Sequence, residues 1–179
     1  AALEKSGQAD STVVIFTSDH GLALGSHGLM GKQNMYEHTI NVPLVIRGPG
    51  FEAGTTCNAQ CYLRDLVPTC LELAGIEVPA SVEAASLMPV VRGEIDEVHR
   101  FIIGYFADKQ RMIRMQDWKY IYYPQVRREQ LFYLANDPFE MKDLSRDRRT
   151  AGIRDELRAE MIQWLKNHGD PLEYESGGQ

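Results

Sequence analysis

The hydrophobic pattern of the first half of the chain predicts short strands separated by a glycine-rich loop. Residues 12–17 and 42–47 are apolar, β-branched runs without alternation, which is typical of strands buried on both faces of a parallel sheet. Four glycines within residues 21–31 indicate a loop with unusual backbone conformations. Residues 1–7 have the pattern of a helix end, and residues 61–74 have apolar side chains at helical spacing. This succession of elements is typical of part of an α/β fold.

After about residue 93 the pattern changes to short aromatic or β-branched runs. These runs are separated by turn-forming or charged residues. We expect these runs to form an antiparallel meander, with strands at residues 101–106, 111–115, 118–123 and 130–134. Alternation within 111–115 predicts a strand with one face in water. Residues 150–168 carry an apolar stripe that includes Met161 and Trp164, which predicts an amphipathic helix packed on the sheet.

Together these elements predict an α/β protein in two parts. Residues 1–93 would form the C-terminal part of a main sheet, and residues 94–179 a small antiparallel sheet packed against a C-terminal helix. Two strands are too few for a parallel sheet, which needs more strands and cover on both faces. We therefore expect further sequence upstream of this chain.

Composition and charge argue against several classes of protein. The chain has 179 residues, of which 44% are hydrophobic, and this is enough for a folded core. Its formal net charge of -6 argues against nucleic-acid binding. No apolar run approaches the roughly 20 residues of a membrane span. The odd number of cysteines cannot all pair within the chain, and no second Cys or His pair follows at zinc-site spacing. We therefore expect free thiols in or near a core.

The residues that suggest chemistry follow the first predicted strand. Asp19 and His20 lie just past its C-terminal end, where open α/β sheets bind ligands. Carboxylate oxygen suits calcium or magnesium and imidazole also suits zinc or manganese, so the residue types alone leave the metal open. Lys32, after the glycine-rich loop, offers a compact charge for an oxyanion. The alternative is structural: Asp19 would cap a turn and Lys32 would be a solvated surface lysine.

Other polar residues near the loop are more ambiguous. A loop histidine such as His27 is more often structural or exposed than catalytic, and His38 and His99 are interpreted as surface residues. Glu37 is interpreted either as a supporting group of the site or as an acid on a helix surface.

Several short motifs occur in a distinctive order and spacing. The first half carries Phe16-Thr-Ser-Asp-His-Gly, Leu24-Gly-Ser-His-Gly, Gly31-Lys32, Tyr36-Glu37, Val42-Pro43-Leu44 and Gly48-Pro49-Gly50. The second half carries Asp65-Leu-Val-Pro-Thr, Asp117-Trp-Lys-Tyr, Leu131-Phe-Tyr-Leu-Ala-Asn-Asp-Pro and Glu140. In this order they resemble the C-terminal portion of the sulfatase family, in the alkaline-phosphatase superfamily. Within that family, the Asp-His form is similar to iduronate-2-sulfatase and choline-sulfatase relatives.

The resemblance implies an alkaline-phosphatase-like fold and a role for each residue of the loop. Asp19 would be the metal-binding aspartate and His20 its neighbouring ligand, with calcium as the usual metal of the family. Lys32 would be catalytic, because it would bridge the sulfate and the nucleophile, and both Lys32 and His27 would contact the substrate. The implied substrate is a sulfated small molecule or glycan.

The sequence also departs from the family pattern. The family nucleophile is a formylglycine made from a Cys/Ser-x-Pro-x-Arg motif, and these residues contain neither that motif nor the upstream paired aspartates. We therefore expect a C-terminal fragment of a sulfatase that is inactive alone, with its nucleophile upstream. Two alternatives stay open: a phosphonate or phosphate monoester hydrolase of the same superfamily, and a non-catalytic domain that lost its catalytic half. The sequence predicts neither oligomeric state nor cellular location.

Overall fold

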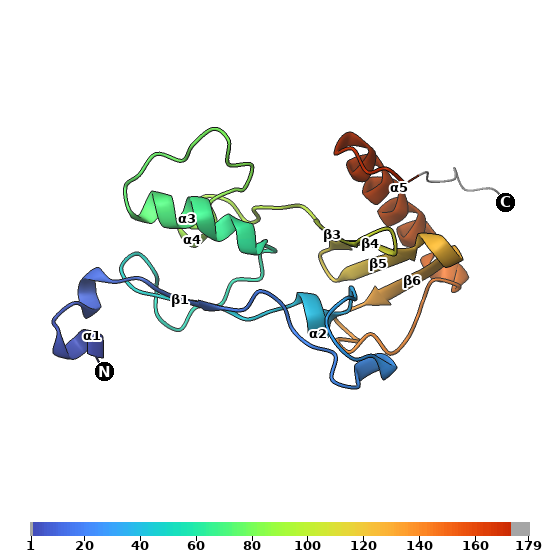
Figure 1. Ribbon diagram of the computed structural model, residues 1–179, viewed down its shortest axis with the longest axis horizontal. Coiled ribbons are helices and arrows are strands. Elements are labelled where there is room, and N and C mark those ends of the chain that lie inside the picture. The colour runs from blue at the N-terminus through green and yellow to red at the C-terminus, as the bar shows by residue number, and fades with distance from the viewer. Residues whose placement is uncertain (1, 173–179) are drawn as a thin grey trace. The chain divides into compact units, whose positions relative to one another are not determined.

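The computed structural model describes residues 2–172 and forms two compact units, each of which is described by itself. Within the described residues, the first consists of residues 2–21 and 41–99, and the second of residues 22–40 and 100–172 (Figure 1). Ala1, the first residue of the predicted helix end, and residues 173–179 lie outside the described residues. The predicted domain boundary after residue 93 stays a prediction, because compact units of this chain need not be the domains of a longer protein.

The first unit contains a two-stranded sheet and short helices. Strands β1 (Val14–Thr17) and β2 (Leu44–Arg47) pair antiparallel, with Val14 opposite Arg47. The expectation of parallel strands is therefore wrong. An unbroken apolar run indicates burial rather than direction, and side chains here alternate between exposed and half-buried. The other elements are α1 (Ala2–Lys5), η1 (Ala9–Ser11), η3 (Leu63–Asp65), α3 (Leu66–Leu73) and α4 (Met88–Val91).

A buried carboxylate organises the start of α3. Asp65 is fully buried, and its Oδ2 accepts a hydrogen bond from the Tyr62 backbone N–H at 2.7 Å. His99 Nε2 lies 2.8 Å from the same oxygen, and Oδ1 accepts the Ala85 backbone N–H at 3.2 Å. The prediction that His99 is a surface residue is therefore wrong, because its ring is the partner of a buried acid far away in the sequence.

Two expectations from composition have different outcomes. All three cysteines are free thiols, as predicted, but Cys57 and Cys70 are exposed rather than part of a core. Across residues 2–172, the structure contains no helix with the length and apolar character needed to cross a membrane.

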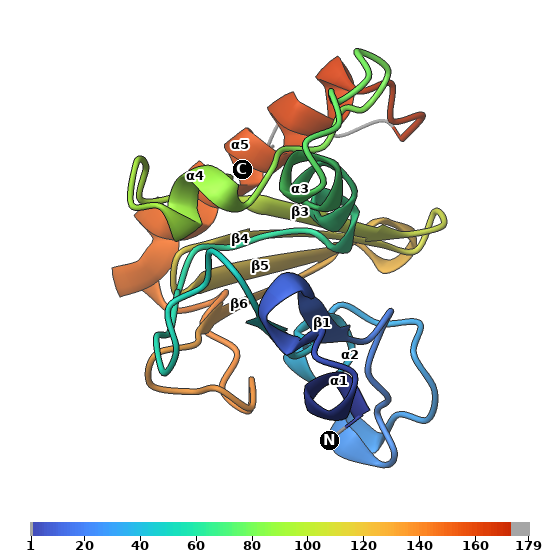
Figure 2. The same ribbon diagram turned by 90° about the vertical axis from the view of Figure 1, so that its left-hand side faces the viewer.

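The predicted strands of the second unit form one antiparallel sheet in chain order, close to their predicted bounds (Figures 1 and 2). They are β3 (Ile102–Phe106), β4 (Gln110–Met115), β5 (Trp118–Tyr123) and β6 (Arg128–Tyr133). The remaining elements of this unit are η2 (Ser26–Gly28), α2 (Glu37–Ile40), η4 (Pro124–Val126), η5 (Arg148–Thr150) and α5 (Ala151–Asn167). In both views α5 lies on one face of the sheet and the segment that contains α2 on the other.

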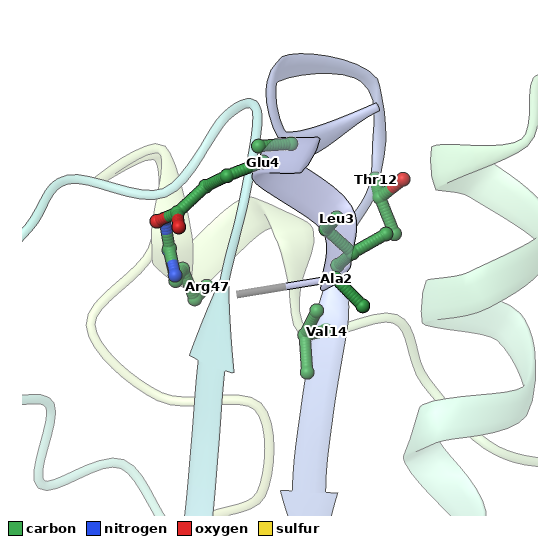
Figure 3. Close-up of a pocket in the computed structure, with 7 residues that line it drawn as sticks. Ala2, Leu3, Glu4, Thr12, Val14 and Arg47 are labelled. Carbon is green, nitrogen blue, oxygen red and sulfur yellow. The ribbon is translucent and has the colours of Figure 1, made fainter. Parts of the chain in front are cut away.

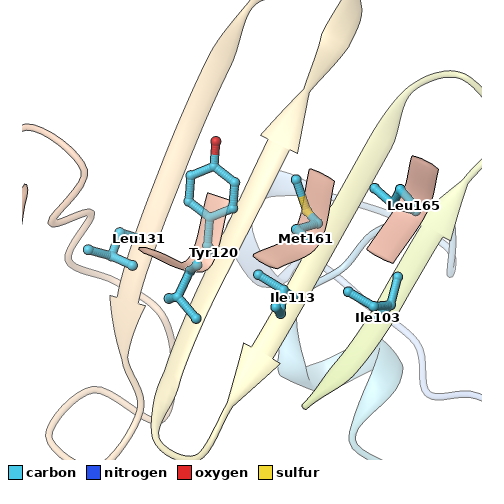
Figure 4. Close-up of a cluster of buried hydrophobic side chains, with 7 residues drawn as sticks. Ile103, Ile113, Tyr120, Leu131, Met161 and Leu165 are labelled. Carbon is cyan, nitrogen blue, oxygen red and sulfur yellow. The ribbon is translucent and has the colours of Figure 1, made fainter. Parts of the chain in front are cut away.

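The face under α5 holds the larger hydrophobic core (Figure 4). Tyr120, on β5, and Met161, on α5, are completely buried, and Trp164 packs against the same cluster. The remaining buried members of this cluster are Ile103, Ile113, Leu131, Leu157 and Leu165. The prediction that the C-terminal helix packs on the sheet is confirmed.

The opposite face of the sheet is also covered. Met35 and Tyr36, from the segment 22–40, pack against a second cluster formed by Met112, Ile121, Phe132 and Leu134. The prediction that β4 has one face in water is therefore wrong. The alternation along β4 is a local signal, and the segment that buries this face lies far upstream in the sequence.

Candidate functional site

The predicted metal ligands lie directly after β1. Asp19 Oδ2 lies 3.1 Å from His20 Nε2, and the other ring nitrogen, Nδ1, lies 3.0 Å from the Gly21 carbonyl oxygen. The side chain of Asp19 is 72% exposed, whereas that of His20 is 30% exposed. Their assignment as metal ligands stays a prediction.

Each nitrogen of the His20 ring has a polar neighbour. When Nδ1–H donates to the Gly21 carbonyl, the neutral imidazole directs the lone pair of Nε2 at the Asp19 carboxylate. In the imidazolium form, Nε2–H instead donates to the Asp19 carboxylate as an ion pair. Across residues 2–172, no group of three or more His, Cys, Asp or Glu side chains is placed to hold a metal. Asp19 and His20 therefore make at most part of a coordination shell, since calcium takes about six to eight oxygen ligands.

The glycine-rich loop is closed by its own backbone hydrogen bonds. Ala23 N–H donates to the Gly31 carbonyl at 2.8 Å, and Gly25 N–H donates to the Leu29 carbonyl at 2.9 Å. Gly25 adopts φ 102° and Gly31 adopts φ 91°. Residues other than glycine rarely adopt these backbone conformations. The glycine spacing in the sequence therefore indicated a real backbone requirement.

His27 is fixed within this loop by a neighbouring ring and a carbonyl group. Its ring stacks on Tyr36 with centroids 4.0 Å apart, and its Nε2 lies 3.0 Å from the Phe139 carbonyl oxygen. These contacts give His27 a packing role in the second unit. Its predicted contact with the substrate stays a prediction.

Lys32 ends the glycine-rich loop and is exposed. It belongs to the second unit, whereas Asp19 and His20 belong to the first. The convergence of the three residues in one pocket therefore stays a prediction, as do their individual roles.

Sequence reasoning missed a buried ion cluster beside this loop. Lys119 Nζ lies 2.6 Å from Glu37 Oε1 and 2.6 Å from Glu140 Oε1, and Arg114 Nη1 lies 2.9 Å from Glu37 Oε2. Burial raises the pKa of Glu140, and the charge of Lys119 offsets part of this rise. Three of these residues stand in the short motifs of the sequence, but the sequence contained no signal that they meet.

His38 is not the simple surface residue that the sequence predicted. Its side chain is half-buried, and Nε2 is buried with no hydrogen-bond partner within residues 2–172. Burial lowers the pKa of His38, and the nearby charges of His27 and Lys119 lower it further.

A separate hollow in the first unit lies at the end of the strand pair away from Asp19 (Figure 3). Its lining combines β1 and β2 with the N-terminal elements, through Ala2, Leu3, Glu4, Ala9, Thr12, Val14 and Arg47. Most of these side chains are aliphatic or small, so the hollow does not add to the candidate chemistry.

Comparison with known proteins identifies relatives over most of the chain. The model of the family "N-sulphoglucosamine sulphohydrolase, C-terminal" matches residues 25–167. An N-acetylglucosamine-6-O-sulfatase of Bacteroides thetaiotaomicron is 32% identical over 181 residues, which cover 94% of this chain and 32% of that protein. A choline-sulfatase of Rhizobium meliloti is 36% identical over 154 residues, which cover 82% of this chain and 30% of that protein.

Solved structures agree with these sequence matches. The structure of a protein in complex with its substrate D-glucosamine-2-N,6-O-disulfate has a TM-score of 0.83 and 32% identity, covering 98% of this chain and 38% of that one. A phosphonate monoester hydrolase of Agrobacterium radiobacter has a TM-score of 0.77 and 26% identity, and the match covers 93% of this chain and 37% of that one. The chain spans about a third of the length of the curated relatives it matches. The alkaline-phosphatase-like fold predicted from the sequence is confirmed, and the chain belongs to the sulfatase family, within the part described as N-sulphoglucosamine sulphohydrolase, C-terminal.

Proposed function

We propose that the intact protein that carries this chain is a sulfuric ester hydrolase, and that the chain supplies one part of its metal site and sulfate site. The observation that carries the proposal is the Asp19–His20 pair, whose carboxylate and imidazole face one another at 3.1 Å at the end of β1. Its place in a sulfatase family supports the same conclusion.

Asp19 and His20 would hold a divalent metal, for which calcium is the family's usual choice. The carboxylate provides the negative charge, and the Gly21 carbonyl fixes the imidazole so that Nε2 faces the same position. When bound, the metal supplies positive charge that stabilises the oxygens of the sulfuryl group during the reaction. The remaining ligands and the formylglycine nucleophile would come from sequence upstream of this chain.

Lys32 would act on the anion rather than on the metal. Its ammonium group is a compact charge with three N–H donors, which suits the oxygens of a tetrahedral anion. In this position Lys32 would stabilise the negative charge that develops between the sulfate and the nucleophile. The substrate would be a sulfated glycan or small molecule, in line with the sulfated sugar bound by one relative of known structure.

The division of the site between this chain and upstream sequence can be tested by activity. We expect the 179-residue chain, supplied with calcium, to hydrolyse no aryl sulfate at an enzymatic rate, because it contains no nucleophile motif. The intact protein should release sulfate, measured by ion chromatography. Turnover by the chain alone that is abolished by Asp19→Ala would contradict the proposal.

A second candidate is the hydrolysis of phosphonate or phosphate monoesters. The similarity to a phosphonate monoester hydrolase favours this candidate, since a metal and a lysine serve either tetrahedral anion. The two candidates are separated by the ratio of kcat/KM for an aryl sulfate and the matching phenyl phosphonate ester on the intact protein. A ratio that favours the phosphonate would replace the first proposal with the second. If the intact protein turns over neither ester nor a sulfated sugar, the non-catalytic alternative is favoured.

A further inference from the structure

Three charged residues of the short motifs meet inside the second unit although they lie far apart in the sequence. Glu37 is the first residue of α2, Lys119 lies on β5, and Glu140 lies in the turns that follow β6. Their side chains are 12%, 0% and 1% exposed, respectively. We call these three residues the ion cluster.

The ion cluster is joined by hydrogen bonds and by charge. Lys119 Nζ donates to Glu140 Oε1 at 2.6 Å. It also lies 2.6 Å from Glu37 Oε1, which is an ion-pair distance. Arg114 Nη1 donates to Glu37 Oε2 at 2.9 Å, and its charge balances the second carboxylate. The ion cluster and Arg114 together therefore carry two positive and two negative charges, which balance.

A buried ion cluster is a poor source of net stability. Removing charged groups from water costs much of what their attraction returns, and hydrophobic residues of similar volume often stabilise a protein as well or better. Such clusters more readily explain a specific arrangement, because an alternative arrangement would leave a buried charge without its partner. The arrangement fixed here is the position of the segment 22–40 on the sheet.

The cluster holds the backbone of this segment as well as a side chain. Glu140 Oε2 accepts the Glu37 backbone N–H at 2.6 Å, so one carboxylate fixes the start of α2 directly. On the same stretch, Tyr36 Oη donates to Gln130 Oε1 at 2.9 Å and Gln110 Nε2 donates to the Gln33 carbonyl at 3.3 Å. These contacts fix residues 33–37 against the sheet immediately after Lys32.

We propose that Glu37, Lys119 and Glu140 are positioning residues for Lys32, which hold the end of the glycine-rich loop in one register on the sheet. This inference rests on the proposed role of Lys32 in binding the anion. Without the cluster, α2 loses its polar anchor to β5 and keeps only apolar packing, such as that of Ile40. The Lys32 ammonium would then sample several positions. The site then loses part of the charge stabilisation that depends on a fixed donor.

The test uses two variants of the intact protein and one matched control. Lys119→Met removes the central cation at similar length, and Glu140→Gln keeps the shape and an acceptor oxygen while it removes one charge. Glu140→Gln serves where Lys119→Met fails to fold. The control is Asp170→Asn, which weakens another buried ion pair of the same unit, formed with Arg111 at 2.6 Å.

Hydrogen exchange measures whether the cluster holds the loop. We expect amide exchange of residues 33–40 to rise at least about tenfold in both cluster variants and to stay unchanged in Asp170→Asn. Unchanged exchange in both cluster variants would overturn the inference. This measurement needs no activity. An intact wild-type protein without esterase turnover would therefore defeat the proposed function, while hydrogen exchange would still decide whether the cluster fixes the segment.

Kinetics measure whether the cluster acts through Lys32. We expect each cluster variant to lower kcat by about 10–100-fold, by analogy with the groups that orient metal ligands. In a Lys32→Ala background the same variants should lower kcat by less than about twofold, because the group they position is gone. A merely structural role would instead lower kcat equally in both backgrounds, and that result would overturn the inference.

Discussion

The two units hold their candidate functional residues in contrasting surroundings. In the first, Asp19 and His20 follow a two-stranded sheet with alternately exposed side chains. In the second, the segment that carries Lys32 lies on a four-stranded sheet whose other face is covered by α5. A two-stranded sheet alone is marginally stable, whereas a sheet covered on both faces can support a fixed loop. We infer that the Asp19–His20 pair needs further structure for support, while the loop that carries Lys32 is positioned within its own unit.

The largest effect on stability should come from the core under α5. Met161→Ala leaves a cavity beneath a fully buried side chain, so we expect the free energy of unfolding to fall by about 2–5 kcal/mol. Urea denaturation of the 179-residue chain measures this change. Met141→Ala is the control, because Met141 is 76% exposed and should change stability by less than about 0.5 kcal/mol. Equal losses of stability in the two variants would contradict the difference expected between a buried and an exposed methionine.

The next effect concerns the charge of Lys32. Lys32→Ala in the intact protein should lower kcat by about 100-fold, the lower end of the range for loss of one donor to a developing oxyanion. Steady-state kinetics on an aryl sulfate measure it. Lys142, an exposed lysine of the same unit, provides the control, and Lys142→Ala should retain wild-type kcat. A wild-type kcat for Lys32→Ala would show that Lys32 does not act in the site.

A smaller effect should come from the tight contact of the segment 22–40 with the sheet. A Cβ on Gly104 would lie 2.8 Å from Met112 Cε and 2.9 Å from Met35 Sδ, so these flexible side chains would have to move. Because both atoms lie near the ends of flexible side chains, we expect Gly104→Ala to destabilise the chain by at most about 1 kcal/mol. Gly152→Ala, on α5, meets no atom within 4 Å and should stabilise by about 0.5–1 kcal/mol. A stabilising effect of Gly104→Ala would show that the segment 22–40 does not press on β3.

The smallest effect is a dependence on pH. Because the folded protein holds the pKa of His38 below its ordinary value of 6.5, the unfolded chain binds a proton more readily. The contribution of neutral His38 to the free energy of unfolding is therefore fully present above pH 6.5, and it is lost as pH falls through the lowered pKa. His38→Gln should reduce the loss of stability between about pH 7.5 and about pH 5, measured by urea denaturation. Identical pH dependence of the variant and the wild type would argue against a buried His38.

The sequence predicted the second unit better than the first. Aromatic runs, turn residues and a helical stripe are local signals, and they located all four strands of the meander and α5. Strand direction in the first unit was wrong because apolar runs do not encode it. The burial of β4 by Met35 and the meeting of Glu37 with Lys119 depend on contacts between distant segments, which no local pattern records.

The candidate site also has features that the sequence predicted and features that it did not. Asp19 and His20 are adjacent in the sequence, so their proximity was predictable from their place after a strand. The glycine spacing predicted the unusual backbone of the loop. The residues that fix the loop were not predictable, because Glu140 follows the last strand of the sheet and meets α2 only in the folded unit.

Calcium titration of the intact protein tests the central claim most directly, namely that Asp19 and His20 hold the metal while Lys32 acts on the anion. Isothermal titration calorimetry would compare the wild type with Asp19→Asn and Lys32→Ala. We expect Asp19→Asn to weaken calcium binding by about 100-fold or more, since even groups that only orient a ligand contribute about 10–100-fold. Lys32→Ala should leave calcium affinity within about twofold of the wild type, because its ammonium group cannot ligate a cation. Equal loss of calcium affinity in both variants, or no loss in either, would contradict the account.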